Sequence, residues 1–94
     1  MKPKISIILS TYNEAYFIEK TLKAIFDNLT DVEVIIVDDS SKDDTCKKIR
    51  DFDDPRIKLF ERKERGLASA FLLGLINTNG EIIGWFDSNM PELF

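Results

Sequence analysis

Two adjacent carboxylates, Asp38 and Asp39, follow a run of four apolar residues, Val-Ile-Ile-Val at 34–37. A run without polar alternation is typical of a strand buried on both faces, as in a parallel sheet with helices on each side. Acidic groups at the carboxyl end of such a strand lie at the edge where open α/β sheets bind ligands. The same pair could instead open a turn and cap the next helix. Taken alone, the acidic pair is equally consistent with ligand binding and with a role in the turn and helix cap.

Two other strand-like segments end in the same way. Residues 5–10 run into Thr-Tyr-Asn-Glu at 11–14, and residues 81–86 run into Asp-Ser-Asn at 87–89. Three apolar segments thus each deliver hydroxyl, amide or carboxylate groups at the same end. This repetition favours a polar binding cleft over three unrelated turns.

Helices are predicted between these strands. Apolar residues at helical spacing within 18–29 predict a first helix, with Asn13 as its N-cap. Ser41 followed by Asp44 has the spacing of a capping box, which predicts a second helix that ends before Pro55.

A third strand and a third helix complete the pattern. Residues 57–60 form a short strand that includes a charge, as is typical of a sheet edge, and residues 67–75 form a helix that stops before Asn-Gly at 79–80. Strands and helices therefore alternate, which predicts a single α/β domain over 1–94 with a parallel, right-handed wound sheet. A strand order of 3-2-1-4 would place residues 11–14 and 87–89 across one cleft, with Asp39 beside them.

Composition narrows the function classes. The chain has 94 residues, 13 basic and 17 acidic, for a net charge of −4, which argues against a nucleic-acid surface. It has no histidine, and its one cysteine, Cys46, excludes a disulfide framework. No apolar stretch has the length of a membrane span, and no signal peptide is evident, so a cytoplasmic location is expected.

Four motifs in order resemble family 2 glycosyltransferases. They are STYNE at 10–14, VDDSS at 37–41 with Asp43 and Thr45 after it, RGLA at 65–68, and GEII at 80–83 leading into DSN at 87–89. The closest likeness is to the dolichyl-phosphate mannose synthase-like and polyprenyl-phosphate sugar transferase branch. The resemblance covers essentially the whole chain and implies the nucleotide-binding part of a Rossmann-like, A-type glycosyltransferase fold.

The resemblance also implies a substrate and a site. The donor would be a UDP- or GDP-sugar, with the sugar transferred under inversion to an acceptor such as a polyprenyl phosphate. Asp39 would accept hydrogen bonds from the base, while Arg65 would approach the diphosphate. The residues that the resemblance places at the nucleotide are Ser10, Tyr12, Glu14, Asp39, Arg65 and Gly66.

A divalent metal site is implied by the same family pattern. Asp87 matches the first acid of the D-x-D signature, which holds Mg²⁺ or Mn²⁺ on the diphosphate, and Asn89 stands where the second acid is expected. An amide oxygen can ligate a hard cation but brings no charge. We therefore expect Asp87 and Asn89 to form a weaker metal site than two carboxylates would.

The family's acceptor-binding part and catalytic base lie beyond the D-x-D region, and this chain ends at Phe94. The resemblance therefore implies that the chain alone binds donor weakly without turnover, and that its parent could work at the cytoplasmic face of a membrane.

The fourth strand would leave an exposed sheet edge, which predicts self-association.

Two other functions fit part of the sequence. In a phosphoacceptor receiver domain, residues 34–40 would be the acidic first-strand end and Asp87 would be phosphorylated, but the first thirty residues would then be unexplained. A truncated α/β scaffold without ligand binding would use its polar strand ends only as caps.

Of the basic residues at 58–65, Arg65 is expected to contact phosphate and the others, Lys58, Arg62 and Lys63, to form a solvated rim.

Overall fold

The computed structural model describes residues 2–87. Strands and helices alternate along this part of the chain, as the sequence predicted. The elements are β1 (Ile5–Thr11), α1 (Ile18–Asn28), β2 (Val32–Asp39), α2 (Thr45–Phe52), β3 (Ile57–Arg62), α3 (Leu67–Ile76) and β4 (Ile82–Asp87).

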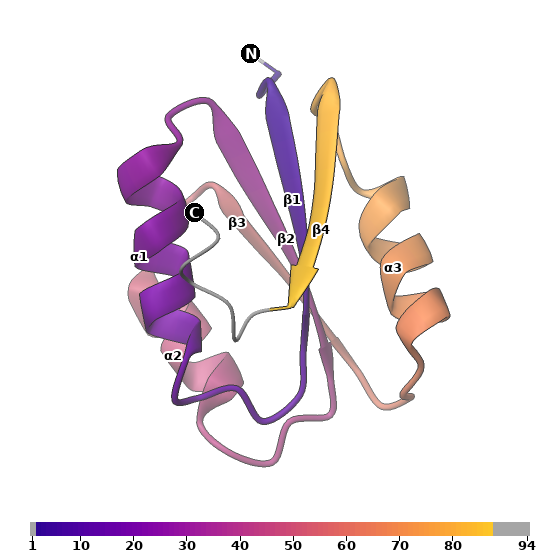
Figure 1. Cartoon of the computed structure of the whole chain (residues 1–94). Helices are drawn as coiled ribbons and strands as arrows, with labels where there is room; N and C mark the ends of the chain where they lie inside the picture. Colours follow the sequence, from indigo (N-terminus) through magenta and orange to yellow (C-terminus); the bar gives the residue numbers. More distant parts are fainter. Residues whose placement is uncertain (1, 88–94) are drawn as a thin grey trace.

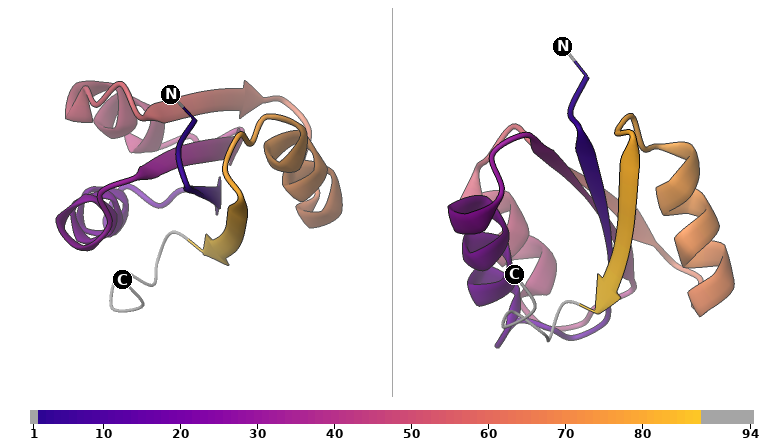
Figure 2. Two further views of the ribbon diagram at one scale, coloured as in Figure 1. Left: turned by 90° about the horizontal axis from the view of Figure 1, so that it is seen from above. Right: turned by 45° about the horizontal axis from the view of Figure 1, so that its top comes forward.

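The four strands form one parallel sheet in the order β3-β2-β1-β4, which confirms the predicted topology. Helices α1 and α2 lie on one face of the sheet and α3 lies on the other (Figures 1 and 2). The register pairs Thr11 with Asp38 and Ser10 with Asp87, so the carboxyl ends of β1, β2 and β4 lie side by side. The polar clusters therefore meet at one end of the sheet.

The two central strands form most of the core. Val34, Ile35, Ile36 and Val37 are completely buried, which explains why β2 shows no polar alternation. Helix α1 packs Ile18, Leu22 and Ile25 against the sheet face that carries Val34 and Ile36. Burying each of these large aliphatic side chains contributes roughly 1.5–3 kcal/mol to stability. This packing holds the strands, and therefore their ends, in fixed positions.

Both predicted helix caps are wrong. Helix α1 begins at Ile18 after Phe17, and Asn13 instead has a left-handed backbone with φ of 52°. Helix α2 begins at Thr45, and the hydroxyl of Ser41 donates to Asp38 rather than capping the helix. Asn13 and Ser41 instead form hydrogen bonds with residues outside the helices that they were predicted to cap. The spacing of residues within one segment does not predict such contacts.

The opposite end of the sheet is held by a buried carboxylate. Glu33 on β2 accepts hydrogen bonds of 2.6 Å from the Ser6 hydroxyl and from the Asn79 backbone amide. The ammonium group of Lys58 on β3 lies 3.2 Å from the same carboxylate, so Lys58 is not purely a solvated residue as predicted. Glu33 thus joins β1, β3 and the connection between α3 and β4.

None of the helices within residues 2–87 is long and apolar enough to cross a membrane.

Candidate functional site

A polar pocket of about 480 Å³ opens at the carboxyl ends of β1, β2 and β4. The loop before α3 completes its wall. The lining residues are Ser10, Thr11, Tyr12, Glu14, Asp39, Arg65, Gly66, Leu67 and Asp87. All the sequence-predicted nucleotide residues are therefore in one place, together with Asp87; Asn89 lies outside the described residues.

Asp38 ties the strand ends beneath this pocket. Its side chain is buried and accepts hydrogen bonds from the Thr11 hydroxyl at 2.6 Å and from the Ser41 backbone amide at 2.9 Å. The Ser41 hydroxyl also donates to it at 2.5 Å. Asp38 therefore fixes the end of β1 against the loop that follows β2, while its neighbour Asp39 lines the pocket.

Two loops, residues 12–17 and 40–44, are also joined directly. The backbone amide of Asn13 donates to Ser41, and the side-chain oxygen of Asn13 accepts from the amide of Lys42 at 2.8 Å. The amide of Glu14 donates to the Thr45 hydroxyl at 2.9 Å. These bonds explain the left-handed backbone of Asn13 and hold Tyr12 and Glu14 at the pocket.

Asp39 is held by an arginine on the neighbouring strand. Arg62 donates from Nε to Asp39 Oδ1 at 2.8 Å, and its Nη2 also lies 2.8 Å from that oxygen. The Gly66 amide donates to the other carboxylate oxygen, Oδ2, at 3.2 Å. Only 9% of the Arg62 side chain and 14% of the Asp39 side chain are exposed. The solvated-rim prediction for Arg62 is therefore wrong.

The same guanidinium group anchors the loop before α3. Arg62 donates to the Ser69 hydroxyl at 2.9 Å and to the Gly66 carbonyl at 3.1 Å. Gly66 has a φ of 155°, which side-chain-bearing residues rarely adopt, so glycine suits this turn. The register between the parallel strands β2 and β3 is what identifies Arg62 as a residue of the site, because it pairs Arg62 with Asp39.

Tyr12 and Arg65 form a second contact in the pocket wall. The Arg65 guanidinium carbon lies 3.7 Å from the centre of the Tyr12 ring, a cation–π geometry. An aromatic face and a cation therefore lie together beside Asp39. Such a pair can contact a flat ring and an anionic group of one ligand.

The opposite wall carries negative charge. Burial raises the pKa of Glu14 above its ordinary value, and the nearby carboxylates of Asp87 and Asp43 raise it further. Glu14 and Asp87 therefore repel each other across the pocket. A divalent cation beside them would relieve this repulsion.

The donor chemistry here fits a hard metal ion. Within residues 2–87 no group of three or more acidic, cysteine or histidine side chains could hold a metal by itself. Mg²⁺ or Mn²⁺ on a diphosphate, however, needs only one or two protein carboxylates, with phosphate and water as the other ligands. Asp87 can supply such a carboxylate.

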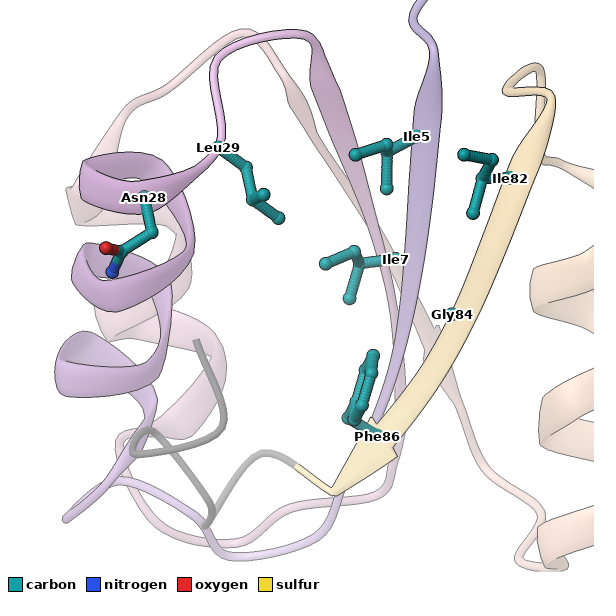
Figure 3. A pocket seen from close by; sticks show the side chains of 7 residues that line it. All are labelled: Ile5, Ile7, Asn28, Leu29, Ile82, Gly84 and Phe86. Carbon is teal, nitrogen blue, oxygen red and sulfur yellow. The ribbon is translucent and has the colours of Figure 1, made fainter.

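A second cavity, of about 310 Å³, lies on the sheet face beside α1 (Figure 3). Ile5 and Ile7 on β1 face Leu29 across it, and Ile82 and Phe86 of β4 form its other side. None of the described residues that line this cavity is charged. It offers apolar contact but no chemistry.

Comparison with known proteins gives a consistent result. The sequence model described as Glycosyl transferase family 2 matches residues 6–89. The match includes β1 and α1, the elements that a receiver domain would leave unexplained.

Individual relatives are similar over nearly the whole chain. A GalNAc(5)-diNAcBac-PP-undecaprenol beta-1,3-glucosyltransferase of Campylobacter jejuni is 34% identical, over 93% of this chain and 30% of its own. A dolichol-phosphate mannosyltransferase of Pyrococcus furiosus is 32% identical, over 95% of this chain and 26% of its own. This chain thus spans less than a third of either relative.

Among solved structures, the mannosyltransferase PcManGT from Pyrobaculum calidifontis, in complex with GDP-Man and Mn²⁺, is 33% identical. It superimposes with a TM-score of 0.82 over 95% of this chain and 28% of its own.

Proposed function

Because this chain belongs to glycosyl transferase family 2, we propose that its polar pocket binds the nucleoside diphosphate of a UDP- or GDP-sugar. The observation that carries the proposal is the gathering of a held carboxylate, an aromatic ring, a cation and a second carboxylate in one pocket of about 480 Å³. The held carboxylate suits the edge of a base and the aromatic ring suits its face. The cation suits a diphosphate, and the second carboxylate suits the metal ion on that diphosphate.

Each residue has a role in this proposal. Asp39 accepts from the base, and Tyr12 with Ser10 contacts the nucleoside. Arg65 is stacked on Tyr12, and its guanidinium can turn toward the diphosphate. Gly66 lets the backbone come close to the ligand because it has no side chain. Glu14 lies across the pocket from the base and contributes to its polar wall.

Asp87 would hold Mg²⁺ or Mn²⁺, with Asn89 as the proposed second ligand. When bound, the metal would stabilise the negative charge that develops on the departing diphosphate. The related PcManGT structure contains Mn²⁺ together with GDP-Man, which supports a metal of this class. The protein's own part is to place a carboxylate at the end of β4, opposite Glu14.

For the whole protein we propose inverting sugar transfer at the cytoplasmic face of a membrane. The names of the two relatives, one acting on an undecaprenol-linked glycan and one on dolichol phosphate, support a polyprenyl phosphate as the class of acceptor. The chain of 94 residues would bind donor without transferring the sugar.

Isothermal titration of this chain with UDP and GDP, with and without Mn²⁺, tests the donor site. We expect binding that is strengthened by Mn²⁺, and we expect Asp87→Ala to abolish that strengthening because the metal loses its carboxylate. Asp27→Ala is the matched control: it removes an exposed acid on α1 that pairs with Lys23 across one helical turn. Equal metal dependence in Asp87→Ala and wild type would contradict the role of Asp87, and no binding of either nucleotide would contradict the proposed function.

A further inference from the structure

The geometry points to a base preference: we infer that Arg62 leaves Asp39 able to accept only one base N–H, so that the pocket takes uracil in preference to guanine. The inference rests on the proposed function and goes beyond it, since it names the nucleotide and a specificity-determining residue. It follows from the hydrogen-bond capacity of one carboxylate.

The acceptor sites of Asp39 are mostly occupied. A carboxylate offers about four lone-pair sites, two on each oxygen. Oδ1 has the Nε and Nη2 groups of Arg62, both at 2.8 Å. Oδ2 accepts from the Gly66 amide at 3.2 Å. One site, on Oδ2, is therefore left for a ligand.

The carboxylate cannot easily turn to free Oδ1. Arg62 is fixed independently by its bonds to the Ser69 hydroxyl at 2.9 Å and to the Gly66 carbonyl at 3.1 Å. The Ser40 hydroxyl also donates to the Arg62 carbonyl at 2.6 Å. Turning Asp39 would separate two charged groups that are almost fully shielded from water, which is unfavourable.

The bases differ in the number of donors they present together. Guanine offers its ring N1–H and its exocyclic amine side by side, a pair that suits both oxygens of a free carboxylate. Uracil offers one donor, N3–H, between two carbonyl oxygens. A carboxylate with one remaining site satisfies uracil fully but leaves one guanine donor without a partner, which is costly in a desolvated site.

Titration of the wild-type chain with four nucleoside diphosphates in Mn²⁺ tests this directly. UDP should bind more than about fivefold tighter than GDP, and N3-methyl-UDP should bind about tenfold weaker than UDP because its only base donor is blocked. Inosine diphosphate keeps the N1–H of GDP but has no exocyclic amine. Inosine diphosphate should therefore bind at least about threefold tighter than GDP, because it has no second donor to leave unpaired.

The outcomes separate the two proposals. A UDP preference below fivefold, a GDP affinity equal to or above that of inosine diphosphate, or full binding of N3-methyl-UDP would each overturn the inference while leaving a nucleotide site in place. Failure of all four nucleotides to bind would overturn the proposed function and the inference with it.

A pair of variants tests whether Arg62 sets the preference. In Arg62→Gln, Oδ1 is free to accept the second guanine donor, so the ratio of UDP to GDP affinity should fall at least about threefold. Arg50→Gln is the matched control, because Arg50 pairs with Glu61 at 3.0 Å on exposed surface and does not line the pocket. A merely structural role for Arg62 would weaken both nucleotides equally, and an unchanged ratio would overturn its role as specificity determinant. The wild-type nucleotide series decides the inference even if Arg62→Gln fails to fold.

Discussion

At the scale of single residues, two neighbouring carboxylates have different functions. Asp38 is buried and joins Thr11 to Ser41, whereas Asp39 lines the pocket and pairs with Arg62. Strand alternation requires adjacent side chains to point to opposite faces, but it does not say which face holds the site. The sequence therefore predicted the position of the pair correctly and could not assign the structural role of Asp38.

Arg62 shows a second limit of sequence reading. It stands among other basic residues at 58–65, where charge alone indicated a solvated surface. Its importance depends on the register between β2 and β3, which pairs it with Asp39. Residue type and spacing within one segment carry no information about that pairing.

A residue-scale prediction concerns Glu33 and acid stability. Burial would raise the pKa of Glu33, but hydrogen bonds from Ser6, Asn79 and Lys58 together lower it below the ordinary value of 4.5. A lowered folded-state pKa means that the unfolded chain binds more protons in acid, so this contribution is present above pH 4.5 and is lost as the pH falls through the folded-state pKa. We expect Glu33→Gln to lower the free energy of unfolding by about 2 kcal/mol at pH 7.

Urea unfolding of wild type and Glu33→Gln between pH 7 and pH 3 checks this prediction. The difference in the free energy of unfolding should narrow as Glu33 becomes protonated below about pH 4.5. Glu19→Gln serves as the control, because it makes the same change on the exposed surface of α1, 3.9 Å from Lys48. A difference that stays constant with pH would show that Glu33 does not contribute through its charge.

At the scale of elements, the strands, the sheet order and the start of α3 followed from the sequence, whereas the starts of α1 and α2 did not. Continuous apolar runs and short connections leave few alternatives to a wound parallel sheet. The starts of α1 and α2 depend instead on loop contacts across 28 or 29 positions of the chain, such as that between Asn13 and Lys42. These contacts take up the side chains that would otherwise cap α1 and α2, so local capping rules fail where the loops build the pocket.

At the scale of the whole molecule, β4 is an edge strand with apolar residues on both faces. Within residues 2–87 it pairs only with β1. Ile82, Ile83 and Trp85 are 53%, 43% and 40% exposed, which is unusual for large apolar side chains on one strand. An unpaired apolar edge is prone to pair with another chain.

We therefore expect the chain to self-associate through β4. Light scattering over a range of concentrations should show the dimer fraction rising with concentration, and Ile82→Lys should shift the equilibrium to monomer by placing a charge at the edge. Ile76→Lys is the control, since Ile76 is 77% exposed but lies on α3. A monomer at every concentration, or equal effects of the two substitutions, would contradict association through this edge.

The central claim is that the polar pocket, rather than the apolar cavity of Figure 3, is the ligand site. Two-dimensional amide NMR of the labelled chain during titration with UDP and Mg²⁺, which is diamagnetic and does not broaden the signals, tests it most directly, because every described non-proline backbone amide reports its own position. We predict progressive shifts at Tyr12, Asp39 and Gly66, with Leu29 and Ile82 at the apolar cavity unchanged. Shifts confined to the apolar cavity, or a spectrum unchanged by either UDP or GDP, would contradict the account.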